Sequence, residues 1–137
     1  DGKINMAIKK DMENRNDIEK FVVEFYENVK KDATIGIIFT ELVKMDWAHH
    51  IPLITDFWET VILDNPVYKN NAMEKHFELN RLYPLTKAHF DAWLKLFNDT
   101  MDGMYSGPKA ALGKTRAGSI AAVMQFKLGN EKNNSLL

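Results

Sequence analysis

Hydrophobic residues recur along this chain at intervals of three and four, the spacing of one face of an α-helix. The first stripe predicts an amphipathic helix capped by Asn16 or Asp17. Its members, at offsets 0, 3, 4, 7, 8 and 11, are Ile18, Phe21, Val22, Phe25, Tyr26 and Val29. A second stripe, at offsets 0, 4, 7, 8 and 11, consists of His50, Ile54, Phe57, Trp58 and Val61. Because proline is tolerated in a first turn but not in a helix interior, Pro52 predicts that this helix begins at or just before His50, or kinks there.

Two further helices are predicted in the second half of the chain. Thr86 is a good N-cap for a stripe that contains Phe90, Trp93, Leu94, Phe97 and Met101. The last helix should begin after Gly107-Pro108 and stop before Gly129, and the residues expected to face inward are Leu112, Ile120, Val123 and Met124, together with several alanines. Residues 35–39 predict a tight helical turn or corner, and residues 72–79 a short helix or extended connector. The predicted fold class is therefore all-α, with strand content near zero.

Composition limits the classes of partner. The 137 residues predict a single domain spanning residues 1–137, with an ordered core over about 17–128 between polar tails. With a net charge of −1, the chain has no excess of positive charge that would attract nucleic acid or an anionic membrane. The lysine pairs 9–10 and 30–31 are expected to be solvated. The absence of cysteine excludes disulfides, thiolate metal sites and covalent c-type haem attachment. Without an apolar run of signal-peptide or membrane-spanning length, we expect a soluble, cytoplasmic protein.

Histidines are the obvious metal-capable residues, and there are four: His49, His50, His76 and His89. None belongs to a paired Glu-x-x-His or a His-Glu-x-x-His motif, and the chain has no glycine-rich phosphate loop and no Gly-x-Ser-x-Gly elbow. We expect His49 near the surface because it points away from the apolar stripe. His89 is also expected there because it falls in the first turn of its helix.

Polar-tipped side chains on the apolar stripes are the stronger signal. Tyr26, His50 and Trp93 lie on three different predicted helices, and His76 lies in the irregular connector. Each alone is more often a packed core residue whose polar tip has an incidental partner. Together they form a set of buried donors and acceptors, each of which costs about 1–3 kcal/mol if it is left without a partner. A bound cofactor or ligand would satisfy them together.

Five ordered motifs resemble the truncated haemoglobins, and within that family group III: FYENV (25–29), DATIGIIF (32–39), WAHH (47–50) followed by DFW (56–58), KHFEL (75–79) and HFDAWLKLF (89–97). The likeness spans residues 18–124. It implies a truncated-globin-like helical sandwich around haem b, with His76 as the proximal iron ligand. It also implies that Tyr26, His50 and Trp93 stabilise a ligand on the distal side, and that the pocket is lined or backed by Phe25, Phe39, Phe57 and Phe90.

The resemblance further implies binding of the diatomic gases O2, CO and NO. If Tyr26 and Trp93 both donate to bound oxygen, these charge-assisted bonds slow its release and make the protein a poor oxygen carrier. Retention favours redox chemistry on bound oxygen, nitric oxide or peroxide, of a nitric oxide dioxygenase-like or peroxidase-like kind, supported by an external reductase. The alternative is a non-enzymatic helical sensor or interaction module with the globin fold. The sequence leaves the oligomeric state open.

Overall fold

Helices make up the regular structure of the part of the chain that the computed structural model describes, namely residues 9–42, 46–71, 76, 79–80 and 84–136, with no side-chain description for 42 and 130–136. The elements are α2 (Arg15–Lys31), the π-helix η1 (Ile38–Leu42), α3 (Trp47–Leu63), α5 (Lys87–Met104) and α6 (Pro108–Leu136). No strand occurs within these residues, so the predicted all-α class is confirmed. None of the helices in the described ranges is long and apolar enough to cross a membrane.

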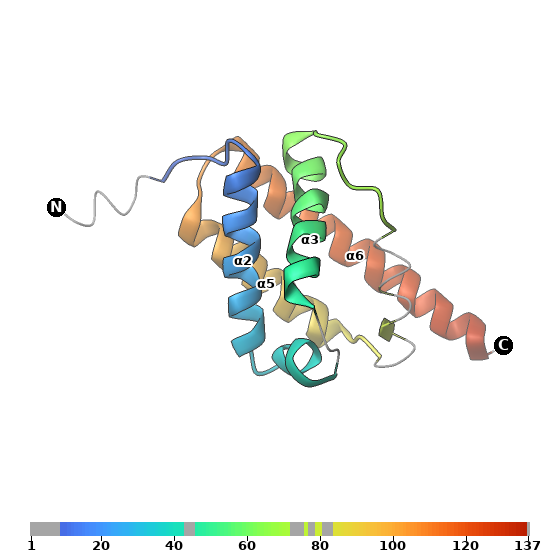
Figure 1. Cartoon of the computed structure of the whole chain (residues 1–137). Coiled ribbons are helices and arrows are strands. Elements are labelled where there is room, and N and C mark those ends of the chain that lie inside the picture. Colours follow the sequence, from blue (N-terminus) through green and yellow to red (C-terminus); the bar gives the residue numbers. More distant parts are fainter. Residues whose placement is uncertain (1–8, 43–45, 72–75, 77–78, 81–83, 137) are drawn as a thin grey trace.

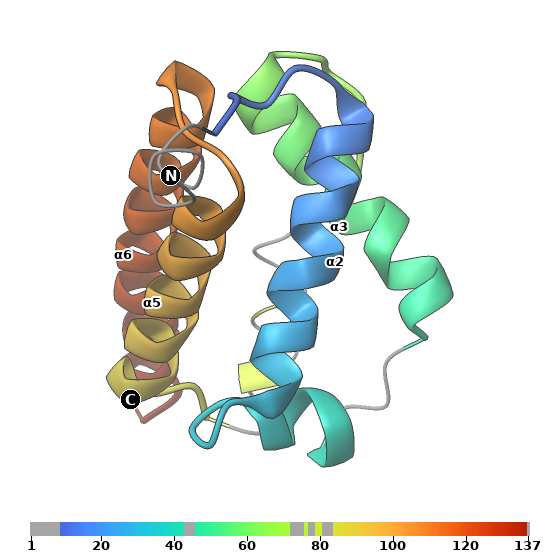
Figure 2. The same cartoon turned by 90° about the vertical axis from the view of Figure 1, so that its left-hand side faces the viewer.

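The long helices are arranged as two pairs, α2 with α3 and α5 with α6, as Figures 1 and 2 show. Across the pairs, α2 contacts α5 and α3 contacts α6. The ring of Phe97 on α5 lies at the junction, with its centroid 4.8 Å from that of Phe21 on α2 and 4.8 Å from that of Trp58 on α3. Because burying such a side chain contributes about 1.5–3 kcal/mol, this aromatic centre is a main source of the fold's stability.

The first helix begins at Arg15, and its N-cap is Asn14 rather than the predicted Asn16 or Asp17. The Asn14 side chain accepts a hydrogen bond from the Asp17 backbone N–H at 3.1 Å. The Asp17 carboxylate is buried, where it accepts the Glu13 N–H at 2.8 Å and pairs with the Lys10 ammonium at 3.2 Å. Asp17, which the prediction took as a possible cap, is the third residue of the helix. The cap lies three residues earlier, at Asn14, and only the cap marks where the helix begins.

The segment before α2, predicted as a polar tail, contributes to the core and caps another helix. Met12 is 1% exposed. The Asp11 carboxylate accepts the backbone N–H groups of Lys109 and Ala110, both at 2.9 Å, and so satisfies amides that the start of α6 leaves unpaired. At Gly107, φ is +144°, and a Cβ there would lie 2.6 Å from the Asp11 Cγ, so this corner requires glycine. Hydrophobic periodicity cannot find such a cap because its partners are far apart in the sequence.

We expect Asp11→Ala to lower the free energy of unfolding by about 1–2 kcal/mol, because the start of α6 loses its capping carboxylate. Chemical denaturation followed by circular dichroism measures the change. Glu13→Ala is the matched control, since it removes an exposed carboxylate two residues away that lies outside the cap. Equal losses in the two variants would contradict the capping role.

Helix α3 begins at Trp47, earlier than predicted, so that Pro52 lies inside the helix. Asp46 is the N-cap: its backbone carbonyl accepts the His50 N–H at 2.8 Å, and its side chain accepts the His49 N–H at 3.4 Å. Pro52 has no N–H to donate to the Ala48 carbonyl, so this part of the helix lacks one backbone hydrogen bond. The Asp46 cap and the tertiary packing of Trp47 offset that loss, and neither is visible in the hydrophobic spacing.

The last helix continues past Gly129 to Leu136, so its predicted end is wrong. An isolated glycine costs a helix only about 1 kcal/mol, and no proline follows it. Val123, expected to face inward, is 51% exposed. The alanines and Met124 do face inward as predicted, and the buried members of this face are Ala110, Ala117, Ala121, Met124 and Leu128.

The predicted turn at 35–39 is confirmed as the approach to η1, where Ile35 and Ile38 are buried while Ile37 is 45% exposed. The Asp32 carboxylate accepts the N–H groups of Thr34 and Ile35, at 2.9 and 3.0 Å, and so fixes the corner after α2. The predicted element at 72–79 lies largely outside the described residues; residues 76 and 79, which are described, are helical.

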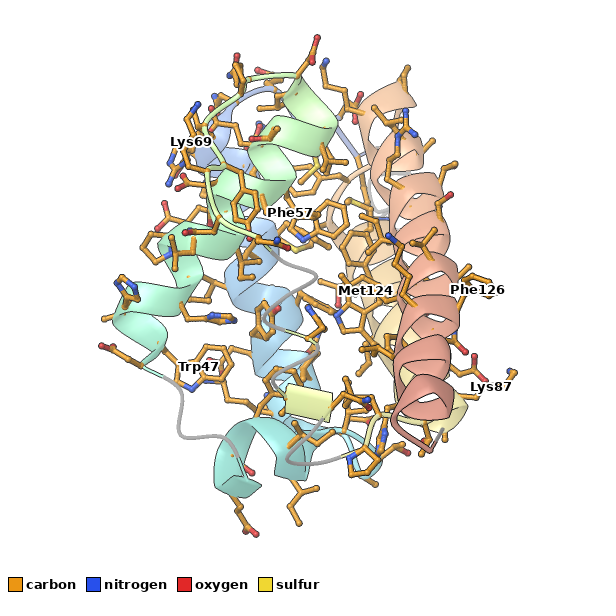
Figure 3. The ribbon with its side chains drawn as sticks, turned by 90° about the vertical axis from the view of Figure 1, so that its right-hand side faces the viewer. Trp47, Phe57, Lys69, Lys87, Met124 and Phe126 are labelled. Atoms are coloured by element: carbon orange, nitrogen blue, oxygen red, sulfur yellow. The ribbon has the colours of Figure 1, made fainter. Side chains whose placement is uncertain are left out.

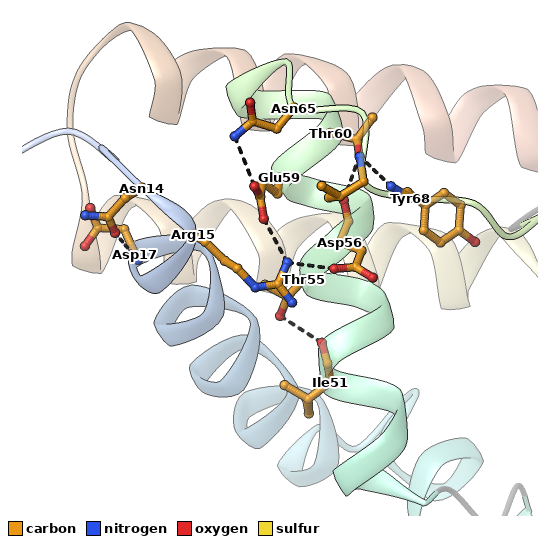
Figure 4. A network of polar contacts seen from close by, with 11 residues as sticks. Asn14, Arg15, Asp17, Ile51, Thr55, Asp56, Glu59, Thr60, Asn65 and Tyr68 are labelled. Carbon is orange, nitrogen blue, oxygen red and sulfur yellow. Dashed lines mark hydrogen bonds and ion pairs between the residues drawn. The ribbon is translucent and has the colours of Figure 1, made fainter.

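A polar network joins α2 to α3 where α2 begins and α3 ends (Figure 4). The Arg15 guanidinium pairs with the Asp56 carboxylate at 2.6 Å and with the Glu59 carboxylate at 2.8 Å. The Asn65 amide donates to the second Glu59 oxygen at 3.0 Å, so this buried carboxylate is hydrogen-bonded on both oxygens. The network fixes one end of the helix pair, and the predicted distal residues Tyr26 and His50 lie towards the other end.

Candidate functional site

Tyr26 lies at the centre of an aromatic cluster built from α2, η1 and α3. Its ring centroid lies between 5.0 and 5.8 Å from the ring centroids of four neighbours: Phe25, Phe39, Trp47 and His50. The residue is 7% exposed, and burial raises the pKa of its phenol far above the usual value. The hydroxyl therefore stays protonated and can donate a hydrogen bond.

His50, at the start of α3, is the polar neighbour of Tyr26. Its half-buried ring stands roughly edge-on to the rings of Tyr26 and Trp47, with both centroid distances at 5.6 Å. Burial lowers the pKa of His50, and the charges of His49 and His76 lower it further. The imidazole is therefore neutral at pH 7, with one nitrogen able to donate and the other able to accept.

A row of half-buried side chains runs along α3 from His50. Ile54, Phe57 and Val61 continue it, whereas the exposed fractions of Thr55, Trp58 and Ile62 on the neighbouring face are 0, 3 and 3%. Phe57 points towards the interior between α3 and α6, and Met124 of α6 points towards it from the other side (Figure 3). The face of α3 with Thr55, Trp58 and Ile62 is thus fully buried in the core. The neighbouring face with Ile54, Phe57 and Val61 keeps partly exposed apolar surface that a hydrophobic ligand would cover.

Trp93 links this region to a second apolar cluster. Its ring centroid lies 5.8 Å from that of Phe25 and 5.4 Å from that of Phe97. Its other side packs against the cluster between α5 and α6, whose members are Phe90, Ala121, Met124 and Leu128. The half-buried indole therefore stands between the Tyr26 aromatics and the interface of α5 with α6.

His76 is helical and half-buried, and it lies close enough to His50 to lower its pKa. Its sequence neighbours at 72–75 and 77–78 lie outside the described residues. Over the described ranges, no group of three or more histidine, aspartate and glutamate side chains could hold a metal ion. A single imidazole suits a cofactor that brings the remaining ligands of its metal with it, as haem does.

Comparison with known proteins identifies the family. The chain is 30% identical over 118 residues to the group 3 truncated haemoglobin ctb of Campylobacter jejuni. The alignment covers 84% of this chain and 91% of that protein. The chain belongs to the group III truncated haemoglobins. The crystal structure of a group III truncated haemoglobin from Campylobacter jejuni matches it with a TM-score of 0.76 at 31% identity, over 88% of this chain and 95% of the other. No family model matches the chain. Membership implies that the chain binds haem and oxygen.

In this truncated haemoglobin, several of the predicted site residues meet. A continuous series of ring contacts runs through Trp93, Phe25, Tyr26, Phe39 and His50, with Tyr26 touching both Phe39 and His50. Two further phenylalanines, predicted to line or back the pocket, are joined to this series indirectly: Phe57 through Trp58 and Phe97, and Phe90 through the cluster against which Trp93 packs. Phe57 contacts Trp58 and Tyr68, and Phe90 lies in the cluster between α5 and α6.

The other two histidines differ from each other. His49 is exposed, as predicted. His89 is half-buried, because its Nδ1 accepts the Thr86 backbone N–H at 2.9 Å and so completes the cap of α5. The position near the surface agrees with the prediction, but the sequence did not reveal this cap, in which histidine takes the place that glutamate or glutamine more often fills.

Trp47 belongs to the same aromatic cluster, although the sequence alone did not point to a role for it. Its ring contacts those of Tyr26, Phe39 and His50, and the Lys30 ammonium lies 4.7 Å from its ring centroid. The available signal was its position three residues before His50, which places the two side chains on the same helical face. Lys30, predicted as a solvated charge, is half-buried instead.

Proposed function

We propose that this truncated haemoglobin binds haem b through His76 and retains a diatomic ligand among Tyr26, His50 and Trp93. The observation that carries the proposal is the meeting of the buried, protonated Tyr26 phenol with the half-buried His50 imidazole, whose ring centroids lie 5.6 Å apart. A donor buried without a partner costs about 1–3 kcal/mol, so polar groups that meet in apolar surroundings are expected to share a bound partner. A bound gas molecule supplies the acceptor.

The residues present fit a haem. The half-buried row of Ile54, Phe57 and Val61 offers apolar surface for a flat hydrophobic ring, and Met124 faces it from α6. Cofactor sites are usually lined by apolar side chains together with a few polar groups that point towards the ligand. When bound, haem supplies an iron with an open coordination position and one-electron redox chemistry.

The distal side chains have separate tasks in this proposal. The raised phenol pKa keeps Tyr26 a donor across the physiological pH range, and the Trp93 indole can only donate. The neutral His50 supplies one further donor or acceptor. A ligand that carries partial negative charge receives charge-assisted hydrogen bonds, each worth about 1.5–3 kcal/mol, so these side chains slow its release.

Slow release supports a role in chemistry on the bound gas more than in oxygen transport. A nitric oxide dioxygenase-like reaction converts dioxygen, nitric oxide and one electron to nitrate, and an external reductase would supply the electron. A peroxidase-like reaction would use the same donors to polarise the O–O bond of hydrogen peroxide, which two electrons from the external reductase and two protons from solvent would convert to two molecules of water. In both reactions the chain's contribution is to hold the small substrate and to stabilise the charge that develops on it.

Haem titration of the purified protein tests the proposal. We expect saturation at one haem per chain, a Soret band, and a further spectral change when carbon monoxide is added after dithionite reduction. These spectra report the cofactor, its coordination and an accessible sixth position together. A protein that folds but stays colourless throughout the titration would contradict the proposal and favour a non-enzymatic sensor or interaction module.

A further inference from the structure

The helices that carry Tyr26 and His50 are also joined by a contact between Lys30 and Trp47. On α2, Lys30 lies one turn after Tyr26, and on α3, Trp47 lies one turn before His50. We infer that Trp47, held by Lys30, is a positioning residue that sets where His50 stands relative to Tyr26. This inference rests on the proposed function, because it concerns the ligand side of the same site.

The ring of Trp47 contacts both groups that it would position. Its centroid lies 5.3 Å from that of Tyr26 and 5.6 Å from that of His50. A third contact, at 6.3 Å, is with Phe39 on the π-helix that follows α2. Figure 3 shows Trp47 at the end of α3 away from the polar network of Figure 4. Movement of this indole would therefore move the first turn of α3 and His50 with it.

The first turn of α3 depends on such tertiary contacts because its backbone bonding is incomplete. Pro52 leaves the Ala48 carbonyl without its usual donor four residues later. The side-chain cap at Asp46 is long, at 3.4 Å to the His49 nitrogen. The Arg15 network holds only the opposite end of the helix pair. The Lys30–Trp47 contact thus fixes the end of α3 that carries His50.

Lys30 is itself held in place for this contact. Its ammonium lies 4.7 Å from the Trp47 ring centroid and 2.9 Å from the Glu27 carboxylate on the same helix. A cation near the face of an indole is attracted by the negative charge of the π-system. Since the Lys30 side chain is 28% exposed, solvent screens the attraction only in part. Glu27, Lys30 and Trp47 together form a clamp between α2 and α3, and we call these three residues the clamp.

Opening the clamp has two measurable consequences. The first turn of α3 becomes freer, so the His50 and Ile51 amides exchange faster with deuterated solvent. The position of His50 beside a bound ligand becomes less defined, so the polarity around that ligand changes. The first consequence appears without haem, and the second requires haem.

Lys30→Met tests the clamp, because it keeps the length of the side chain and removes its charge. We expect the His50 and Ile51 amides of the haem-free variant to exchange about 2- to 10-fold faster, which is the factor expected for a partly screened cation–π contact. In the haem-loaded variant we expect a shifted C–O stretching band for added carbon monoxide and faster carbon monoxide dissociation. Lys30→Arg should retain the wild-type values, since guanidinium also stacks on indole.

Lys31→Met is the matched control. It removes the same charge at the next position, where the side chain is exposed, and should leave all three measurements unchanged. Trp47→Leu should reproduce the Lys30→Met changes with larger amplitude. If it does not fold, Lys30→Met alone decides the matter.

Unchanged exchange and an unchanged C–O band in Lys30→Met, with normal haem uptake, would overturn the inference and leave the proposed function intact. Failure of the wild-type protein to take up haem would instead overturn the proposed function. In that case the exchange rates of the haem-free protein would still show whether Lys30 holds the first turn of α3.

Discussion

Replacing His76 with alanine is expected to remove the axial bond between the protein and the haem iron while the described helices stay folded. The other histidines are poorly placed to replace it. His49 is exposed, and the His89 ring accepts the Thr86 N–H, while the His50 ring contacts that of Tyr26 in the aromatic cluster. We therefore expect loss of the five-coordinate haem spectrum, nearly complete at equimolar haem, and its partial recovery when free imidazole is added.

Absorption and resonance Raman spectra of the reconstituted protein measure this axial bond directly. His49→Ala is the matched control, because it removes an exposed imidazole and should leave the spectrum as in the wild-type protein. Circular dichroism of both variants checks that the helices have formed. An unaltered axial ligand in His76→Ala would show that another side chain binds the iron, and the assignment of His76 would then be wrong.

Hydrophobic periodicity was sufficient to predict the helices, because burial of one face decides where a helix packs. The stripes from Ile18 and from Phe90 became α2 and α5, whose faces meet at Phe97. The helix ends were harder to predict, because capping decides them. Asn14 and Asp46 are polar residues outside the stripes, and the cap of α6 comes from Asp11 at the other end of the chain. Capping contacts of this kind produce no repeating pattern in the sequence by which they could be predicted.

The candidate site was predicted where its residues lie on stripes and missed where it depends on contacts between elements. Tyr26, His50 and Trp93 combine an apolar-face position with a polar tip, which is a signal that sequence analysis can detect. The pairing of Lys30 with Trp47 requires α2 and α3 to be placed side by side first. The lining or backing of the pocket by Phe57 and Phe90 stays a prediction, because spacing gives the face of a helix but not the neighbour that this face meets.

Removing the distal donors is expected to have the second large effect. Tyr26→Phe keeps the ring that contacts Phe39, Trp47 and His50 and removes only the hydroxyl. Trp93→Phe likewise keeps an aromatic ring beside Phe25 and removes the indole N–H. Because a charge-assisted bond is worth about 1.5–3 kcal/mol, oxygen should dissociate roughly 10- to 100-fold faster from each variant. The double variant should release it several hundredfold faster, short of full additivity because the two donors share one acceptor.

Stopped-flow displacement of oxygen measures these rates. Haem titration should show an affinity for haem within about threefold of the wild-type protein, since ring packing is retained.

Tyr105→Phe is the control variant, because the Tyr105 hydroxyl already has a protein partner, the Asp17 carbonyl at 3.3 Å. Its loss should lower the stability of the haem-free protein by about 1 kcal/mol without changing oxygen release. Tyr26→Phe should instead speed oxygen release and leave the stability of the haem-free protein nearly unchanged, because the ring keeps its contacts with Phe39, Trp47 and His50. Unaltered oxygen release in both distal variants would remove the case for ligand retention.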